Sequence, residues 1–382
     1  MKTEDPLGGL PGPPAPEPES EPDQAERQRH RIPATPTTVL LLAVVGAGFA
    51  AQFALGKGGE NEALASFRLG SLMPAAVLQG DWYRLGSYAF LHGGAVHLLV
   101  NAWALWVLMR PIEAALGPFA ALGIFSGTAI AGGAASLGWN LWRGFALQSA
   151  VGASGGAFGL FGAHCAIYLR VRRYLPPQAR AQAARPLLYN LLMNLALAFG
   201  AVVGGLPLDN AAHAGGFLSG MALGAVAAVP RLLPPRGWHR GASVLFMLCA
   251  FALASMEGAA VARAAHPQPR VLHADGAEAV VPWYLIEATP GIADTADFEF
   301  EVHLERSDSP SLLPDSRTLH LGSQDWREHR AIDAGGVRYV DLLEPRTRLL
   351  VRVGCLRDPC AEDRRDALAG EVASHARATG PP

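Results

Sequence analysis

The chain has 382 residues, of which 50% are hydrophobic and 17% charged, and its formal net charge is −2. An average soluble domain carries about 25% charged residues, so this composition argues against a protein that is soluble throughout. No lysine and arginine cluster lies on a soluble segment, and the sequence therefore gives no reason to expect a nucleic-acid partner.

Three stretches of the chain differ in composition. Residues 1–36 are polar and proline-rich, residues 37–262 are apolar, and residues 263–382 have an ordinary soluble composition. The first stretch has too little apolar surface to offset the entropy lost on ordering, so we predict a disordered tail. It also lacks the apolar core of a cleavable secretory signal.

The apolar stretch predicts a polytopic membrane protein of the all-α class. A helix needs about 20 apolar residues to cross the hydrocarbon core of a bilayer. Seven segments approach or meet that length: 37–55, 85–109, 118–141, 153–169, 186–206, 211–229 and 241–262.

The arginines and lysines between these segments set the expected orientation, because cytoplasmic loops carry an excess of them. One set of loops holds Arg27, Arg29, Arg31, Arg110, Arg170, Arg172, Arg173, Arg180, Arg185, Arg231, Arg236 and Arg240, whereas the other holds only Lys57, Arg68, Arg84 and Arg143. We therefore expect a cytoplasmic tail (1–36), a six-helix core (37–230), a cytoplasmic loop with a seventh span (231–262) and an external domain (263–382). The composition, rich in alanine, glycine and arginine, suggests a bacterial plasma (inner) membrane.

The first external loop, residues 56–84, is long and partly apolar. Its aromatic residues fit the headgroup region, which predicts a loop that lies in the membrane interface. The alternative is a plain surface loop.

A few polar side chains inside or beside the spans are candidates for function, because such residues are costly in a membrane. His97 and Asn101 are four residues apart and share one helix face in the second span. Ser154 opens the fourth span and His213 lies near the start of the sixth. The second, fourth and sixth spans run in the same direction, so these groups lie at one depth and can meet in one cavity.

A serine beside a histidine suggests nucleophilic catalysis. A neutral His213 can take the proton from the Ser154 hydroxyl near pH 7. The N–H groups at the start of the helix that Ser154 opens favour negative charge. Asn101 and His97 can add donors to an oxyanion.

Other interpretations of these residues remain. Ser154 alone suits helix packing, and His213 alone suits a hydrogen-bonded core position. His92 and His97 are possible metal ligands, but their spacing does not place them on one helix face and no carboxylate or thiolate is nearby in sequence, so we expect no metal and no cofactor. Three further polar residues in spans predict hydrogen bonds between helices: His164, Asn190 and Asn194.

Three motifs together resemble the rhomboid family of intramembrane serine proteases. The segment from His92 through His97 to Asn101 resembles the family's His-x4-His-x3-Asn element, and Gly152-Ala153-Ser154-Gly155 resembles its Gly-x-Ser-Gly motif. The segment that begins at His213 and carries Gly216 and Gly220 is similar to its last core helix. The resemblance covers roughly residues 37–230, where the family has six helices; it also allows a seventh.

This resemblance implies a Ser154–His213 dyad and an oxyanion site made by the Ser154 N–H with Asn101 and His97. It implies no acidic third member, and Asp209 is expected to be a loop or helix-start residue. The supporting positions that it implies are His92, Gly152, Gly155, Phe158 (where a tyrosine is frequent), Gly216, Gly220, Arg84 and Glu113.

Residues 263–382 lie outside the resemblance. Phe298, Phe300, Val302 and Leu304 alternate with polar residues, as in a half-buried strand, and so do Leu349, Val351 and Val353. A terminal helix is expected over 361–377. We predict a small β-rich soluble domain, in which Cys355 and Cys360 can pair if the compartment is oxidising. Substrate recruitment and a passive role are both open for it.

These observations predict an intramembrane serine endopeptidase that acts on single-span or other membrane-anchored proteins in the lipid bilayer. One alternative is a catalytically inactive member of the same fold that binds or escorts membrane proteins. Another is a transporter or channel, which would favour internal repeats and broken helices that the sequence does not show.

Overall fold

The structure is a computed structural model that describes residues 35–56, 62–204, 208–229, 237–289, 292–295, 300–307, 316–321, 323–332, 336–356 and 360–379. The tail expected at the N-terminus falls almost entirely outside these residues, as do most of the loop expected over 231–240 and Phe298.

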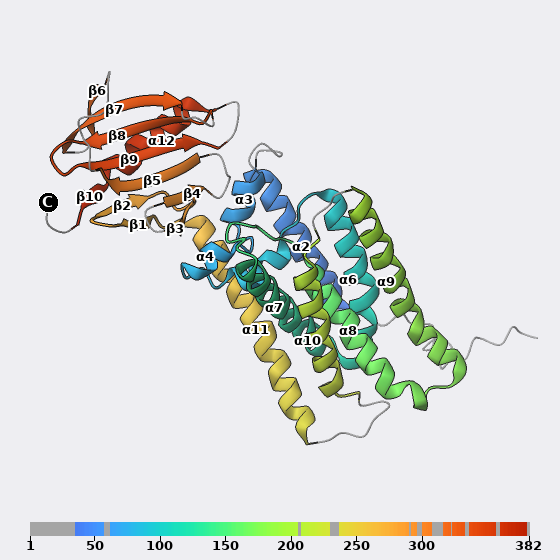
Figure 1. The fold of residues 1–382 in the computed structure, drawn as a ribbon. Helices are drawn as coiled ribbons and strands as arrows, with labels where there is room; N and C mark the ends of the chain where they lie inside the picture. Colours follow the sequence, from blue (N-terminus) through green and yellow to red (C-terminus); the bar gives the residue numbers. More distant parts are fainter. Residues whose placement is uncertain are drawn as a thin grey trace, which may run out of the picture. The chain divides into compact units, whose positions relative to one another are not determined.

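Long helices occupy the apolar part of the chain (Figure 1). They are α2 (Pro36–Leu55), α6 (Ala95–Leu116), α7 (Pro118–Trp142), α8 (Ser154–Val171), α9 (Pro177–Gly204), α10 (Asn210–Val226) and α11 (Trp238–Ala265). Among the described residues, 4 helices are long and apolar enough to cross a membrane: α2, α6, α7 and residues His239–Ala265 of α11. A helical membrane protein is therefore supported, while seven spans remain a prediction.

The start of the second predicted span is wrong. The apolar run from residue 85 is divided between the short helix α5 (Arg84–Ser87) and the 3-10 turn η1 (Tyr88–Phe90), and α6 begins only at Ala95. Gly94 has a φ of 126°, a left-handed conformation that ends the preceding structure and precedes the helix. Hydrophobicity alone does not reveal such a break.

Helices α8 and α10 pack backbone against backbone. A Cβ on Gly216 would lie 2.1 Å from the Gly155 carbonyl oxygen, and a Cβ on Gly220 would lie 2.0 Å from that of Gly159. A Cβ on Gly224 would lie 2.5 Å from the Ala163 carbonyl oxygen, so the contact repeats every four residues on both helices. Small residues at this spacing allow close helix approach in membranes.

The loop between α2 and α6 contains two further short helices, α3 (Glu62–Arg68) and α4 (Pro74–Leu78), and much of it is buried. Arg84 is 2% exposed and donates to the carbonyl oxygens of Phe67 (2.8 Å) and Ser71 (2.9 Å). Leu72 and Ala150 exchange backbone hydrogen bonds of 3.0 and 2.8 Å. The loop thus supports the segment that leads to Ser154, and a plain surface loop is excluded.

Glu113 connects α6 to the start of α2. Its carboxylate accepts the N–H groups of Thr37 and Thr38, both at 2.9 Å, and the Thr38 hydroxyl at 2.6 Å. These N–H groups have no partner within their own helix, and the negative charge also suits a helix N-terminus.

The C-terminal part of the chain forms two antiparallel sheets. The order is β1-β2-β10 in one and β3-β4-β5-β9-β8-β7-β6 in the other. The strands are β1 (Arg270–Ala274), β2 (Ala277–Val281), β3 (Leu285–Thr289), β4 (Ile292–Thr295), β5 (Phe300–Arg306), β6 (Arg317–Leu321), β7 (Gln324–Ile332), β8 (Arg338–Glu344), β9 (Leu349–Cys355) and β10 (Ala376–Ala378). Alternating burial along β5, from Phe300 to Leu304, matches the predicted strand pattern.

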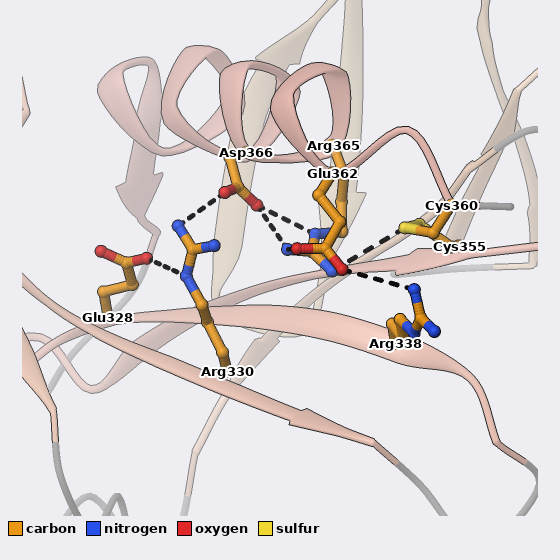
Figure 2. Close-up of polar contacts among 8 residues, drawn as sticks. All are labelled: Glu328, Arg330, Arg338, Cys355, Cys360, Glu362, Arg365 and Asp366. Carbon is orange, nitrogen blue, oxygen red and sulfur yellow. Dashed lines mark hydrogen bonds and ion pairs between the residues drawn. A yellow bond between two sulfur atoms is a disulfide. The ribbon is translucent and has the colours of Figure 1, made fainter.

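Helix α12 (Glu362–Ser374) covers this sheet and shares a core with Trp326, which is fully buried. Figure 2 shows the polar contacts that join it to the strands: Arg330 contacts Glu328 and Asp366, each at 2.6 Å. Cys355 and Cys360 form a disulfide just before this helix.

Candidate active site

Ser154 is the first residue of α8, and His213 lies one turn into α10. His213 Nε2 and Ser154 Oγ are 2.9 Å apart, a hydrogen-bond distance. The close glycine contacts between the two helices allow this approach. Ser154 directly precedes Gly155, and His213 lies one turn before Gly216. The sequence expectation that these two side chains meet agrees with this geometry.

Two further residues support His213: Asp209 caps its helix, and Phe158 packs on its ring. Asp209 is the N-cap of α10: its carboxylate accepts the Ala212 N–H at 2.9 Å and also the Ser136 hydroxyl. It therefore acts at the helix start, as expected. Phe158 stacks on the imidazole with ring centroids 4.2 Å apart and an interplanar angle of 11°.

His97 covers the turn that precedes Ser154. Gly152 has a φ of 130°, and a Cβ there would lie 2.8 Å from His97 Cε1 and 3.0 Å from its Nε2. The Gly93 N–H donates to His97 Nδ1 at 3.3 Å, which assigns the proton of the neutral ring to Nε2. An N–H donor is therefore available beside Gly152 and Ser154.

Asn101 and His92 both lie against His97. Asn101 is 3% exposed and its Nδ2 donates to the His97 carbonyl oxygen at 2.9 Å, so this bond stays inside α6 and is not directed at Ser154. His92 is fully buried in the loop before α6, with its ring edge-on to that of His97 at 5.2 Å. Burial, with a smaller contribution from His97, lowers the pKa of His92 to about 3, so its ring is neutral at pH 7.

Gln52 is a supporting residue that the sequence reasoning missed. It is 2% exposed, accepts the His92 N–H at 3.1 Å and donates to the His92 carbonyl oxygen at 2.9 Å. It also donates to the Ser66 hydroxyl at 2.8 Å. A single amide side chain in an otherwise apolar span was the signal that would have identified it.

The start of α8 completes the chemistry available at the site. The first N–H groups of a helix have no intrahelical partner, and the partial positive charge there favours an anion. Ser154 and His213 can supply a nucleophile and its base, while these N–H groups and His97 can stabilise an oxyanion. Within the described ranges, no three metal-ligating side chains gather in one place.

The predicted hydrogen bonds between helices find no support at His164. It is 8% exposed, and its buried Nδ1 has no hydrogen-bond partner within the part of the chain that the structure describes. The side chains of Asn190 and Asn194 lie outside the described part of α9.

Comparison with known proteins places the site within a matched domain. Residues 79–230 match the model of the Rhomboid domain. The chain is 32% identical over 177 residues to RHOMBOID-like protein 5 of Arabidopsis thaliana, covering 44% of this chain and 54% of that protein. It is 30% identical over 172 residues to Rhomboid protease AarA of Providencia stuartii (41% and 59%), and 29% identical over 172 residues to Rhomboid protease GluP of Bacillus subtilis (45% and 31%). The chain spans about half the length of the curated relatives it matches.

Proposed function

Because the chain belongs to the rhomboid family and is an integral membrane protein, we propose that it is an intramembrane serine endopeptidase. Its substrates are single-span or other membrane-anchored proteins, cut in or near the transmembrane segment. The observation that carries this proposal is the 2.9 Å contact between His213 Nε2 and Ser154 Oγ.

In the proposed reaction, His213 Nε2 takes the proton of the Ser154 hydroxyl as Oγ attacks the carbonyl carbon of the scissile peptide bond. The oxyanion that forms accepts hydrogen bonds from the Ser154 N–H and from His97 Nε2, with Asn101 as a further donor if its amide turns from the His97 carbonyl. The histidine then returns the proton to the leaving amine. Water hydrolyses the acyl-enzyme with the same histidine as base.

The surrounding residues hold these groups in place. Gly152 leaves room for His97, Phe158 holds the imidazole of His213 by stacking, and Asp209 anchors the start of α10. We propose that the C-terminal domain lies outside the cytoplasm and that the site around Ser154 opens on that side. The loops at the opposite ends of the predicted spans hold most of the arginines, which favours those ends for the cytoplasm.

Cleavage of a panel of tagged single-span proteins by the full chain in bilayers tests this function. Ser154→Ala and His213→Ala are each expected to lower the cleavage rate by roughly 10⁴-fold or more, because loss of one member of such a catalytic unit costs nearly as much as loss of the whole unit. Ser219→Ala is the matched control, because its hydroxyl donates to the carbonyl oxygens of Gly215 and Gly216 in its own helix. If Ser154→Ala cuts the substrates as fast as Ser219→Ala, the assignment of Ser154 as the nucleophile is wrong.

The inactive alternative needs a test without a known substrate. A fluorophosphonate probe reacts with an activated serine hydroxyl and forms a covalent bond to Oγ as fluoride leaves. Labelling that is lost in Ser154→Ala and retained in Ser219→Ala supports the peptidase. A folded wild-type chain that is neither labelled nor active on any member of the panel would favour the binding or escort module.

A further inference from the structure

A cavity of about 480 Å³ lies where the loop before α5, the C-terminal end of α11 and strands β1–β3 meet. This volume is within the usual range for small-ligand sites. Four guanidinium groups, those of Arg68, Arg84, Arg263 and Arg270, line it together with the single carboxylate of Asp81, which leaves a net charge of +3. The cavity is separate from the residues around Ser154.

Two of the four arginines are held by ion pairs with Asp81. Arg84 Nε and Arg270 Nη2 both contact Asp81 Oδ2, at 3.0 and 2.6 Å, and Arg84 Nη1 donates to the carbonyl oxygens of Phe67 and Ser71. Arg270 Nε also donates to the Trp283 carbonyl oxygen at 3.3 Å. One carboxylate therefore balances only one of these two positive charges.

The other two arginines retain donors for a ligand. Arg68 donates from Nε to the Ala264 carbonyl oxygen at 3.0 Å, and its guanidinium carbon lies 6.0 Å from the centre of the Trp283 ring. Its terminal N–H groups have no hydrogen-bond partner among the described residues and can therefore contact a ligand. Arg263 is exposed in the last turn of α11. Burial raises the pKa of Tyr83, whose hydroxyl in the cavity wall is therefore a neutral donor at pH 7.

The length of α11 indicates that the cavity lies at the depth of lipid headgroups. Helix α11 has 28 residues and is about 42 Å long at 1.5 Å per residue, against a hydrocarbon core of about 30 Å. Its last turn, with Arg263, therefore reaches the headgroup region. Leu78 and Trp82 on the neighbouring loop are 62% and 58% exposed, and exposed tryptophan is typical of this region.

We propose that this cavity binds the phosphate of an anionic phospholipid headgroup. The planar guanidinium fork matches the oxygens of a phosphate in pairs, and basic clusters beside a span attract anionic lipids. The acyl chains would leave toward Leu78 and Trp82, while the phosphate contacts Arg263 and Arg68. A soluble phosphate shares this chemistry, and the experiment distinguishes the two sources.

The test is calorimetric titration of the full chain in uncharged detergent with three probes: short-chain phosphatidylglycerol, phosphatidylcholine with the same chains, and inorganic phosphate. Phosphatidylglycerol is expected to bind most tightly. Arg263→Gln should weaken it about tenfold, the loss expected for one charge-assisted contact. Arg240→Gln is the matched control, because it removes the same charge from an exposed position at the other end of α11.

The site is independent of the proposed peptidase activity, and binding can be measured in Ser154→Ala. Inorganic phosphate that binds as tightly as the lipid, with the same dependence on Arg263, supports the phosphate site and assigns it a soluble source. Equal weakening by Arg263→Gln and Arg240→Gln, or no binding of phosphatidylglycerol or phosphate, overturns the proposal. Unchanged thermal unfolding of the Arg263→Gln chain shows that folding is retained.

Discussion

Helices α8 and α10 and the C-terminal sheets solve the same packing problem in opposite ways. Between α8 and α10 the contact depends on missing side chains, since carbonyl oxygens occupy the space where the Cβ atoms of Gly216 and Gly220 would be. In the C-terminal sheets large side chains fill the interior, with Trp326 as the largest that is fully buried. Apolar side chains gain little by leaving lipid but gain much by leaving water. Hence one region should tolerate added atoms badly and the other should tolerate removed atoms badly.

The largest expected effect is in the sheets. Trp326→Ala should lower the free energy of unfolding of the C-terminal domain by about 3–5 kcal/mol, because a large cavity remains. Trp326→Phe is the control: it fills most of the space and removes a buried indole N–H that has no partner among the described residues, so it should cost less than about 1.5 kcal/mol. Hydrogen exchange of the backbone amides in β7–β9 measures the change in the free energy of unfolding in both variants. Equal losses in the two variants would refute the packing argument.

The matching change in the helices adds a single methyl group. Gly220→Ala places a Cβ 2.0 Å from the Gly159 carbonyl oxygen, and a backbone atom cannot turn aside as a side chain can. We expect α8 and α10 to separate, a destabilisation of about 1–3 kcal/mol and a loss of most cleavage activity because the Ser154–His213 contact opens. Thermal unfolding and the cleavage assay follow these two effects.

Gly258→Ala is the control for that prediction. A Cβ at Gly258 in α11 would meet nothing within 4 Å, so this change should be neutral or stabilise the helix by about 0.5–1 kcal/mol. Should both alanine variants behave alike, helix propensity and not the α8–α10 contact would be the cause.

This difference between the regions also explains what could be predicted from the sequence. The expected bounds of α2 and α7 agree with the structure to within two residues, because hydrophobic length is a local property. The meeting of Ser154 and His213 followed from the shared direction of their helices. By contrast, the start of α6 depends on the left-handed turn at Gly94, and the arginine-lined cavity joins residues more than 200 positions apart. Neither leaves a local pattern in the sequence.

Charged side chains also have different roles in the apolar helices and in the C-terminal sheets. Glu113 is a buried carboxylate among the helices. Glu113→Gln replaces a group that accepts three hydrogen bonds at the start of α2 by one whose amide nitrogen would face other donors. We expect a cost of about 1.5–3 kcal/mol, measured by thermal unfolding in detergent. Glu371→Gln, at an exposed position in α12, serves as the control and should leave the unfolding midpoint unchanged. A similar midpoint in both variants would mean that water replaces Glu113 at the helix start.

The smallest effect is expected where ion pairs lie on the surface of the sheets. Arg377 contacts Glu278 across β10 and β2, but its side chain is 77% exposed, so water and salt screen the pair. Arg377→Gln should change the free energy of unfolding by less than about 1 kcal/mol, and this difference should vanish at high salt because screening removes it. Thermal unfolding at low and high ionic strength gives both values. A loss of stability as large as that caused by Glu113→Gln would mean that the edge strand β10 depends on this ion pair. Charged side chains would then stabilise the sheets as much as they stabilise the helices.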